Sequence, residues 1–146
     1  MPVSGILKEV GAPKATLIEG TMSSILAPSN SLSVIQGSSK TLELTVTNSD
    51  DNTPVDLTGA TIYFTMKDVI TDPQAVLQKI STDTAQIEIT TPRDGKAQIK
   101  FLPADTKTKD PGTYTFDVWA VLASGKRIVP IPPTTLKIER SVTVIP

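Results

Sequence analysis

The run DPGTYTFDVWAV, residues 110–121, carries the clearest structural signal in this sequence. Its apolar residues are spaced two apart: Tyr114, Phe116, Val118 and Ala120. In a β-strand, successive side chains point to opposite faces, so a period of two places one set in a core and the other in solvent. The run therefore predicts a long, half-buried strand.

The same alternation recurs from residue 32 onward. It predicts further strands around residues 42–46, 62–66, 76–80, 87–89, 97–101, 127–131 and 136–144. Turn clusters separate them, and the Asp94–Gly95 pair favours a tight hairpin. Pro130, Pro132 and Pro133 cannot donate to a sheet ladder, so we expect their stretch at an edge or a crossover. No helical stretch of ten or more residues is present, and the pattern indicates a β-sandwich.

The start of the first run also resembles a known structural motif. Asp110, Gly112 and Tyr114 follow the Asp–x–Gly–x–Tyr spacing of the tyrosine corner in immunoglobulin-like domains. In that corner the tyrosine hydroxyl satisfies an upstream backbone group, and Phe116 stands where antibody domains have their second cysteine. We therefore predict an all-β, immunoglobulin-like β-sandwich. The motif carries no information on chemistry.

The composition excludes most catalytic chemistry. The 146 residues include no cysteine and no histidine, which removes disulfides, thiol nucleophiles, the commonest zinc ligand and the usual general base. No Ser–x–x–Lys or Gly–x–Ser–x–Gly motif is present. Asp50, Asp51 and Asp56 could gather around Ca²⁺, but they lack the spacing of a dedicated calcium loop and fit a solvated turn better. We expect no enzyme, no cofactor and no metal site.

Charge and hydropathy limit the partners. The net charge of −1 gives no long-range field for nucleic acid or an anionic membrane. No uninterrupted apolar run approaches the roughly 18 residues that span a bilayer, and no basic leader is visible at the start of the chain. We expect a soluble protein that is made in the cytoplasm and binds neither nucleic acid nor membrane.

The amino-terminal residues differ from the rest. Residues 1–30 carry apolar side chains with neither helical nor strand periodicity, whereas residues 31–146 form the predicted sandwich. Two interpretations are open: a strand that folds back onto its own domain, or an extended arm, which we favour, that docks on neighbouring subunits. The residues expected to bind there are Val3, Ile6, Leu7, Val10, Leu17, Ile18, Met22, Ile25 and Leu26.

Trp119 lies on the face of the first run that is expected to be solvated, beside Asp117. It either packs against the amino-terminal arm or a loop of its own chain, or it anchors a partner. Exposed tryptophans are frequent hot spots of binding. We therefore include Trp119 among the candidate partner-binding residues.

The stretch NTPVDLTGATIYFTMK, residues 52–67, resembles the opening of small immunoglobulin-like domains in structural proteins of tailed bacteriophages. The amino-terminal domain of the upper baseplate protein family is one example. Residues 95–99 (GKAQI), 102–106 (LPADT) and 111–114 (PGTY) follow the same layout, so that the resemblance covers roughly residues 32–144.

The resemblance implies a scaffold without catalytic residues. Baseplate relatives typically continue into long helical or receptor-binding regions, whereas this chain ends at Pro146; a sandwich with an arm is closer to a capsid decoration, or cement, protein. The leading hypothesis is a virion protein, made in the host bacterial cytoplasm, that binds capsid or tail subunits and associates with its own copies. The alternatives are a baseplate, tail or neck accessory protein, and a carbohydrate- or host-surface-binding module with Trp119, Tyr63 and Tyr114 as its candidate aromatic platform.

Overall fold

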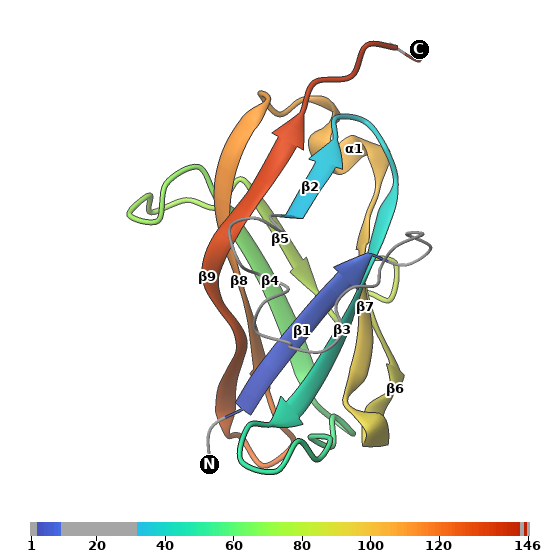
Figure 1. Cartoon of the computed structure of the whole chain (residues 1–146), viewed down its shortest axis with the longest axis vertical. Helices are drawn as coiled ribbons and strands as arrows, with labels where there is room; N and C mark the ends of the chain where they lie inside the picture. The colour runs from blue at the N-terminus through green and yellow to red at the C-terminus, as the bar shows by residue number, and fades with distance from the viewer. Residues whose placement is uncertain (1–2, 10–31, 144, 146) are drawn as a thin grey trace.

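The strands pack as two facing layers (Figure 1). The computed structural model describes residues 3–9, 32–143 and 145. The four-stranded sheet has the order β1 (Val3–Glu9), β3 (Lys40–Asn48), β7 (Lys96–Phe101), β6 (Ile87–Thr91). The five-stranded sheet has the order β2 (Leu32–Ile35), β9 (Arg127–Glu139), β8 (Gly112–Val121), β4 (Thr61–Lys67), β5 (Leu77–Ile80). Within the described residues, the helices are the 3₁₀ turn η4 (Pro92–Asp94) and α1 (Pro103–Lys107). The predicted all-β, immunoglobulin-like sandwich is confirmed.

The core forms between the two sheets from side chains spaced two residues apart. In β8 the buried residues are the predicted ones, Tyr114, Phe116, Val118 and Ala120. The ring of Phe64, from β4, stacks on Phe116 with 5.3 Å between centroids. It also meets Phe101 of the other sheet edge-on at 5.5 Å. Such aromatic pairs contribute about 0.5–1.5 kcal/mol beyond the area they bury, so this cluster helps to hold the two layers together.

The predicted tyrosine corner is present at the start of β8. The Tyr114 hydroxyl donates a hydrogen bond of 2.6 Å to the backbone carbonyl of Asp110, and the side chain is buried. Burial raises the pKa of Tyr114 above its ordinary value of 10.0, and the nearby carboxylates of Asp68 and Asp110 raise it further. The corner therefore holds a neutral phenol in the folded state.

Replacing this phenol tests the corner. Tyr114→Phe removes the donor to the Asp110 carbonyl and should lower the free energy of unfolding by about 1–2 kcal/mol at pH 7. Because the pKa is raised by folding, the unfolded tyrosine loses its proton first as the pH rises past about 10. The contribution of Tyr114 is therefore complete below that pH and is lost above it, and the wild type and the variant should converge there. Urea titrations at pH 7 and above pH 10 measure the free energy of unfolding of the wild type and of Tyr114→Phe. The same difference between the two proteins at both pH values would contradict the role assigned to the Tyr114 hydroxyl.

The proline-rich part of β9 lies at an edge, as its sequence predicts. β2 runs parallel to β9 but pairs only with Leu136–Glu139. Within the described chain, the stretch around Pro130, Pro132 and Pro133 therefore has β8 as its ladder partner on one side and none on the other. The β8–β9 register also shifts in this region. The prolines lack backbone N–H groups, but this costs little stability here because no second strand pairs with this part of β9.

The connection from β6 to β7 confirms the predicted hairpin in a slightly different form. η4 replaces a two-residue loop, and Gly95 follows it with φ of 69°. A Cβ at this position would lie 2.4 Å from the carbonyl oxygen of Val46. Only glycine satisfies both the left-handed backbone and this close approach.

The amino-terminal strand corrects the expected domain boundary. β1 pairs antiparallel with β3, from Val3 opposite Asn48 to Glu9 opposite Leu42 (Figure 1). Leu7 is 1% exposed and belongs to the core, and Val3 packs against that core. Residues 3–9 are therefore a strand of the sandwich, which is the first of the two interpretations, and the docking arm that we favoured is wrong for them.

The physical reason is visible at Gly5. A Cβ there would lie 2.6 Å from the carbonyl oxygen of Pro130, so the glycine that interrupts the sequence pattern is what lets β1 approach β9. Of the predicted binding residues, Leu7 and Val3 pack within the chain, whereas Ile6 lies opposite Thr45 on the outer face of the sheet and is half-buried. Val10, Leu17, Ile18, Met22, Ile25 and Leu26 lie outside the described residues.

A methyl group at Gly5 tests this placement. Gly5→Ala should push β1 away from Pro130 and lower the free energy of unfolding by about 1–3 kcal/mol, as overpacking does. The loss should not depend on protein concentration, because the strand belongs to the same molecule. Ser4→Ala is the matched control: it removes only a hydroxyl contact of 3.2 Å to Thr47 and should cost at most about 1 kcal/mol. The stability of each variant is measured by urea unfolding. If Gly5→Ala is as stable as the wild type, β1 does not pack against Pro130.

Candidate binding face

Trp119 and Tyr63 lie side by side on the outer face of the five-stranded sheet. They are directly opposite each other in the antiparallel β4–β8 pair, where Cβ atoms are about 4.5–5.5 Å apart. Trp119 is 41% exposed and Tyr63 is 40% exposed. Two aromatic side chains therefore form one exposed patch, and the role of Trp119 as an anchor for a partner stays a prediction.

The patch lies in a shallow groove, which we call the outer-face groove. Its volume is about 630 Å³. The residues that line it come from β4, β8 and β9 and from the loop after β4: Tyr63, Thr65, Lys67, Ile70, Thr115, Phe116, Asp117, Trp119, Val121, Arg127 and Pro133. Phe116 itself is buried, so its ring belongs to the core below.

The strand register sets the order of side chains along the groove. Lys67 is opposite Thr115, Thr65 is opposite Asp117, and Tyr63 is opposite Trp119. Arg127 of β9 is opposite Val121 at the far end of β8. The groove therefore has a cation at each end, with hydroxyl, carboxylate and aromatic groups between them.

Asp117 fixes the orientation of the tryptophan. The indole Nε1–H of Trp119 donates a hydrogen bond of 3.0 Å to Oδ2 of Asp117. Residues two apart share one face of a strand, which is why this bond can form. The other carboxylate oxygen of Asp117 makes no hydrogen bond within the part of the chain that the structure describes. It remains able to accept one from a ligand.

The outer face of the four-stranded sheet has a different character. Apart from Ile6 of β1, these outward side chains are half-buried and polar or charged: Thr41, Glu43, Thr45, Lys96, Gln98, Lys100 and Glu88. Lys100 and Glu88 form an ion pair of 2.7 Å. A partly exposed ion pair on the surface of a sheet contributes little to stability. The aromatic patch thus distinguishes one face of the sandwich from the other.

The remaining sequence candidates lie elsewhere. Tyr114 is the buried corner residue, so the structure brings together two of the three proposed platform aromatics and excludes the third. Asp56 accepts hydrogen bonds from the Thr58 hydroxyl and amide, at 2.6 and 2.9 Å, and these bonds lower its pKa. Asp51 is held in the same way by Thr53. In the described residues, no three acidic side chains are placed to share a metal ion.

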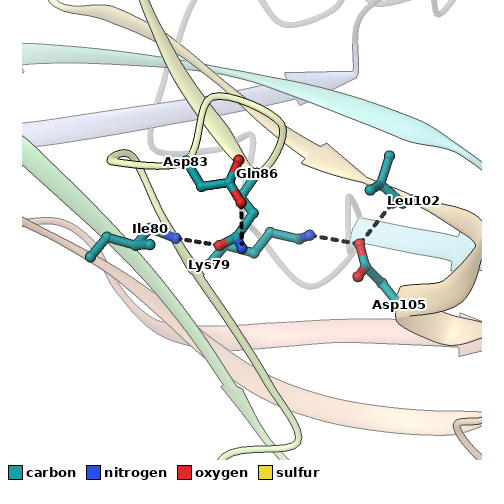
Figure 2. A network of polar contacts seen from close by, with 6 residues as sticks. All are labelled: Lys79, Ile80, Asp83, Gln86, Leu102 and Asp105. Carbon is teal, nitrogen blue, oxygen red and sulfur yellow. Dashed lines mark hydrogen bonds and ion pairs between the residues drawn. The ribbon is translucent and has the colours of Figure 1, made fainter.

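A buried ion pair escaped the sequence reasoning. Figure 2 shows Lys79 reaching Asp105, with 2.6 Å between Nζ and Oδ2. Lys79 is 3% exposed and lies opposite Phe64 in the β4–β5 register, so it points into the sandwich. The same Asp105 oxygen accepts the Leu102 amide at 2.7 Å. The pair joins β5 to α1 and takes no part in the groove.

Comparisons with known proteins inform the fold only. No protein-family model and no curated protein matches the sequence. Dimeric latent PorU from Porphyromonas gingivalis superposes with a TM-score of 0.50 at 13% identity, over 99% of this chain and 13% of PorU. MtrC from Shewanella baltica has a TM-score of 0.48 at 13% identity, over 100% of this chain and 23% of MtrC. CopC from Methylosinus trichosporium has a TM-score of 0.43 at 10% identity, over 79% of this chain and 89% of CopC.

The chain thus spans a small part of PorU and of MtrC, and at these identities a likeness concerns the fold alone. Among the described residues, no helix is long and apolar enough to cross a bilayer.

Proposed function

We propose that this chain is a non-enzymatic structural protein of a bacteriophage particle, of the capsid decoration type, whose sandwich is displayed as a binding module. The resemblance of residues 32–144 to immunoglobulin-like domains of phage structural proteins supports the viral setting. The lack of histidine and cysteine supports a role in binding rather than catalysis. A baseplate, tail or neck position is the alternative within the particle.

The observation that carries the proposal is the exposed Tyr63–Trp119 pair in the outer-face groove. Single apolar side chains on a protein surface are common, whereas adjacent ones that form a patch often mark a binding site. Here the sequence places two aromatic rings opposite each other, and Asp117 holds one of them in place. We assign recognition of the host surface to this groove. Attachment to capsid or tail subunits, and to neighbouring copies, is assigned to the segment that contains Leu17, Ile18 and Met22.

Two binding assays on one set of variants test this division. The purified protein is added to particles that lack it and, separately, to host cells. Trp119→Ala should reduce binding to cells by about 30-fold, corresponding to about 2 kcal/mol for an aromatic hot spot, and should leave particle binding unchanged. Ile35→Ala, which trims an exposed side chain on β2 outside the groove, is the control and should bind both targets normally.

The two assays separate the outcomes. Loss of particle binding in Trp119→Ala, with no cell binding by the wild type, would instead make the groove the docking surface for capsid or tail subunits. Normal binding of the variant to both targets would remove the groove from the function altogether. Copy number from mass spectrometry of whole particles distinguishes shell decoration from a baseplate or neck position.

A further inference from the structure

The shape of the outer-face groove suits an elongated ligand. From Thr115 to Val121 the groove follows six residue steps of β8, or roughly 20 Å at about 3.3 Å per residue. β4 runs alongside over the same length, so that the groove is a trough parallel to the strands. A chain-like molecule fits such a trough better than a single compact ligand.

The groove offers ring surfaces and hydrogen-bonding groups in close alternation. Tyr63 and Trp119 provide two adjacent aromatic surfaces. Next to them along the strands, Thr65 and Asp117 provide a hydroxyl and a carboxylate. Sugar rings have the matching chemistry, because one face of a pyranose presents C–H groups while its edge presents hydroxyls. Aromatic side chains that combine an apolar body with a polar tip suit this kind of mixed surface.

A protein partner fits these observations less well. Stable protein interfaces bury about 800 Å² on each partner, over 20–30 residues, around an apolar centre. The outer-face groove contains three large exposed apolar side chains, Tyr63, Trp119 and Ile70. Threonine and charged side chains occupy most of the remainder. Three large apolar side chains form a much smaller apolar centre than the roughly 20–30 residues of a stable protein interface provide, whereas oligosaccharides bind to small mixed surfaces.

The charges in the groove indicate the kind of sugar. Lys67 and Arg127 give two positive charges and Asp117 gives one negative charge, so the groove carries a net charge of +1. Neither cationic side chain makes an ion pair or a hydrogen bond to a described residue. They lie at opposite ends of the groove, on either side of the aromatic pair. Both are available for carboxylate or phosphate groups along a ligand.

From these observations we infer that the outer-face groove binds a linear acidic oligosaccharide, stacked on Tyr63 and Trp119 and held at its ends by Lys67 and Arg127. The inference rests on the proposed function, in that it names the ligand class of the same face. The hydrogen bond from Trp119 to Asp117 holds the indole before the ligand arrives, which reduces the entropy lost on binding.

The single tryptophan of the chain provides the readout. Titration of the full-length protein with hexagalacturonate should produce a saturable change in Trp119 emission, whereas cellohexaose, a neutral chain, should bind more weakly. Tyr63→Ala keeps the fluorophore and removes half of the platform; it should weaken hexagalacturonate binding by about tenfold or more. Arg127→Gln should weaken hexagalacturonate and leave cellohexaose unchanged. Ile35→Ala is the control and should match the wild type.

The outcomes separate the two proposals. No saturable change with either probe at millimolar concentration, or full binding by Tyr63→Ala, would overturn the oligosaccharide assignment. If Trp119→Ala still loses cell binding in that case, the displayed binding face stands and its receptor is a protein. Equal affinity for both probes in the wild type would overturn the acidic character of the ligand. Circular dichroism of each variant verifies that the sandwich is folded.

Discussion

Phe64 of β4 stacks on Phe116 of β8 and meets Phe101 of the opposite sheet edge-on. The outward side chains of β4 and β8 depend on this contact. Side chains on a strand alternate between faces, so the burial of Phe64 and Phe116 forces Tyr63, Asp117 and Trp119 outward. A slip of one residue in either strand would exchange the two faces. The aromatic core and the aromatic patch are thus two consequences of one register.

The two outer faces of the sandwich present different kinds of side chain. The four-stranded sheet presents threonine and charged side chains, with the Lys100–Glu88 ion pair among them. Its free edge at β3 is covered by β1, which Gly5 allows to lie against Pro130. The five-stranded sheet instead presents two aromatic rings flanked by a fixed carboxylate and two cations. The side chains proposed to bind a ligand therefore lie on one outer face, and the opposite side of β4 and β8 packs into the core.

Much of the fold follows from local sequence signals. The two-residue period identifies β3, β4, β7 and β8, and the spacing of Asp110, Gly112 and Tyr114 identifies the corner. β1 does not follow from local signals, because Gly5 leaves a gap in its two-residue period and the residue that it approaches, Pro130, is far away in the sequence. Lys79 and Asp105 could not be paired for the same reason.

The site was predicted in part. Periodicity places Trp119 on the outer face, because it depends only on neighbouring residues of β8. The opposition of Tyr63 and Trp119 depends on the register between strands that are more than 50 residues apart. Arg127 enters the groove through a third strand, with a shifted register that no local pattern contains. The sequence therefore predicts that Trp119 is exposed, but not which residues surround it.

Hydroxyl-radical footprinting, with oxidation of Trp119 and Tyr63 measured by mass spectrometry, tests the central claim most directly. It is applied to the free protein, to the protein bound to particles, and to the same particles bound to host cells. The account predicts strong oxidation of both side chains in the first two states and protection of both in the third, with Ile35 unchanged throughout. Protection of Trp119 and Tyr63 on particles alone, or undiminished oxidation on cells, would contradict it.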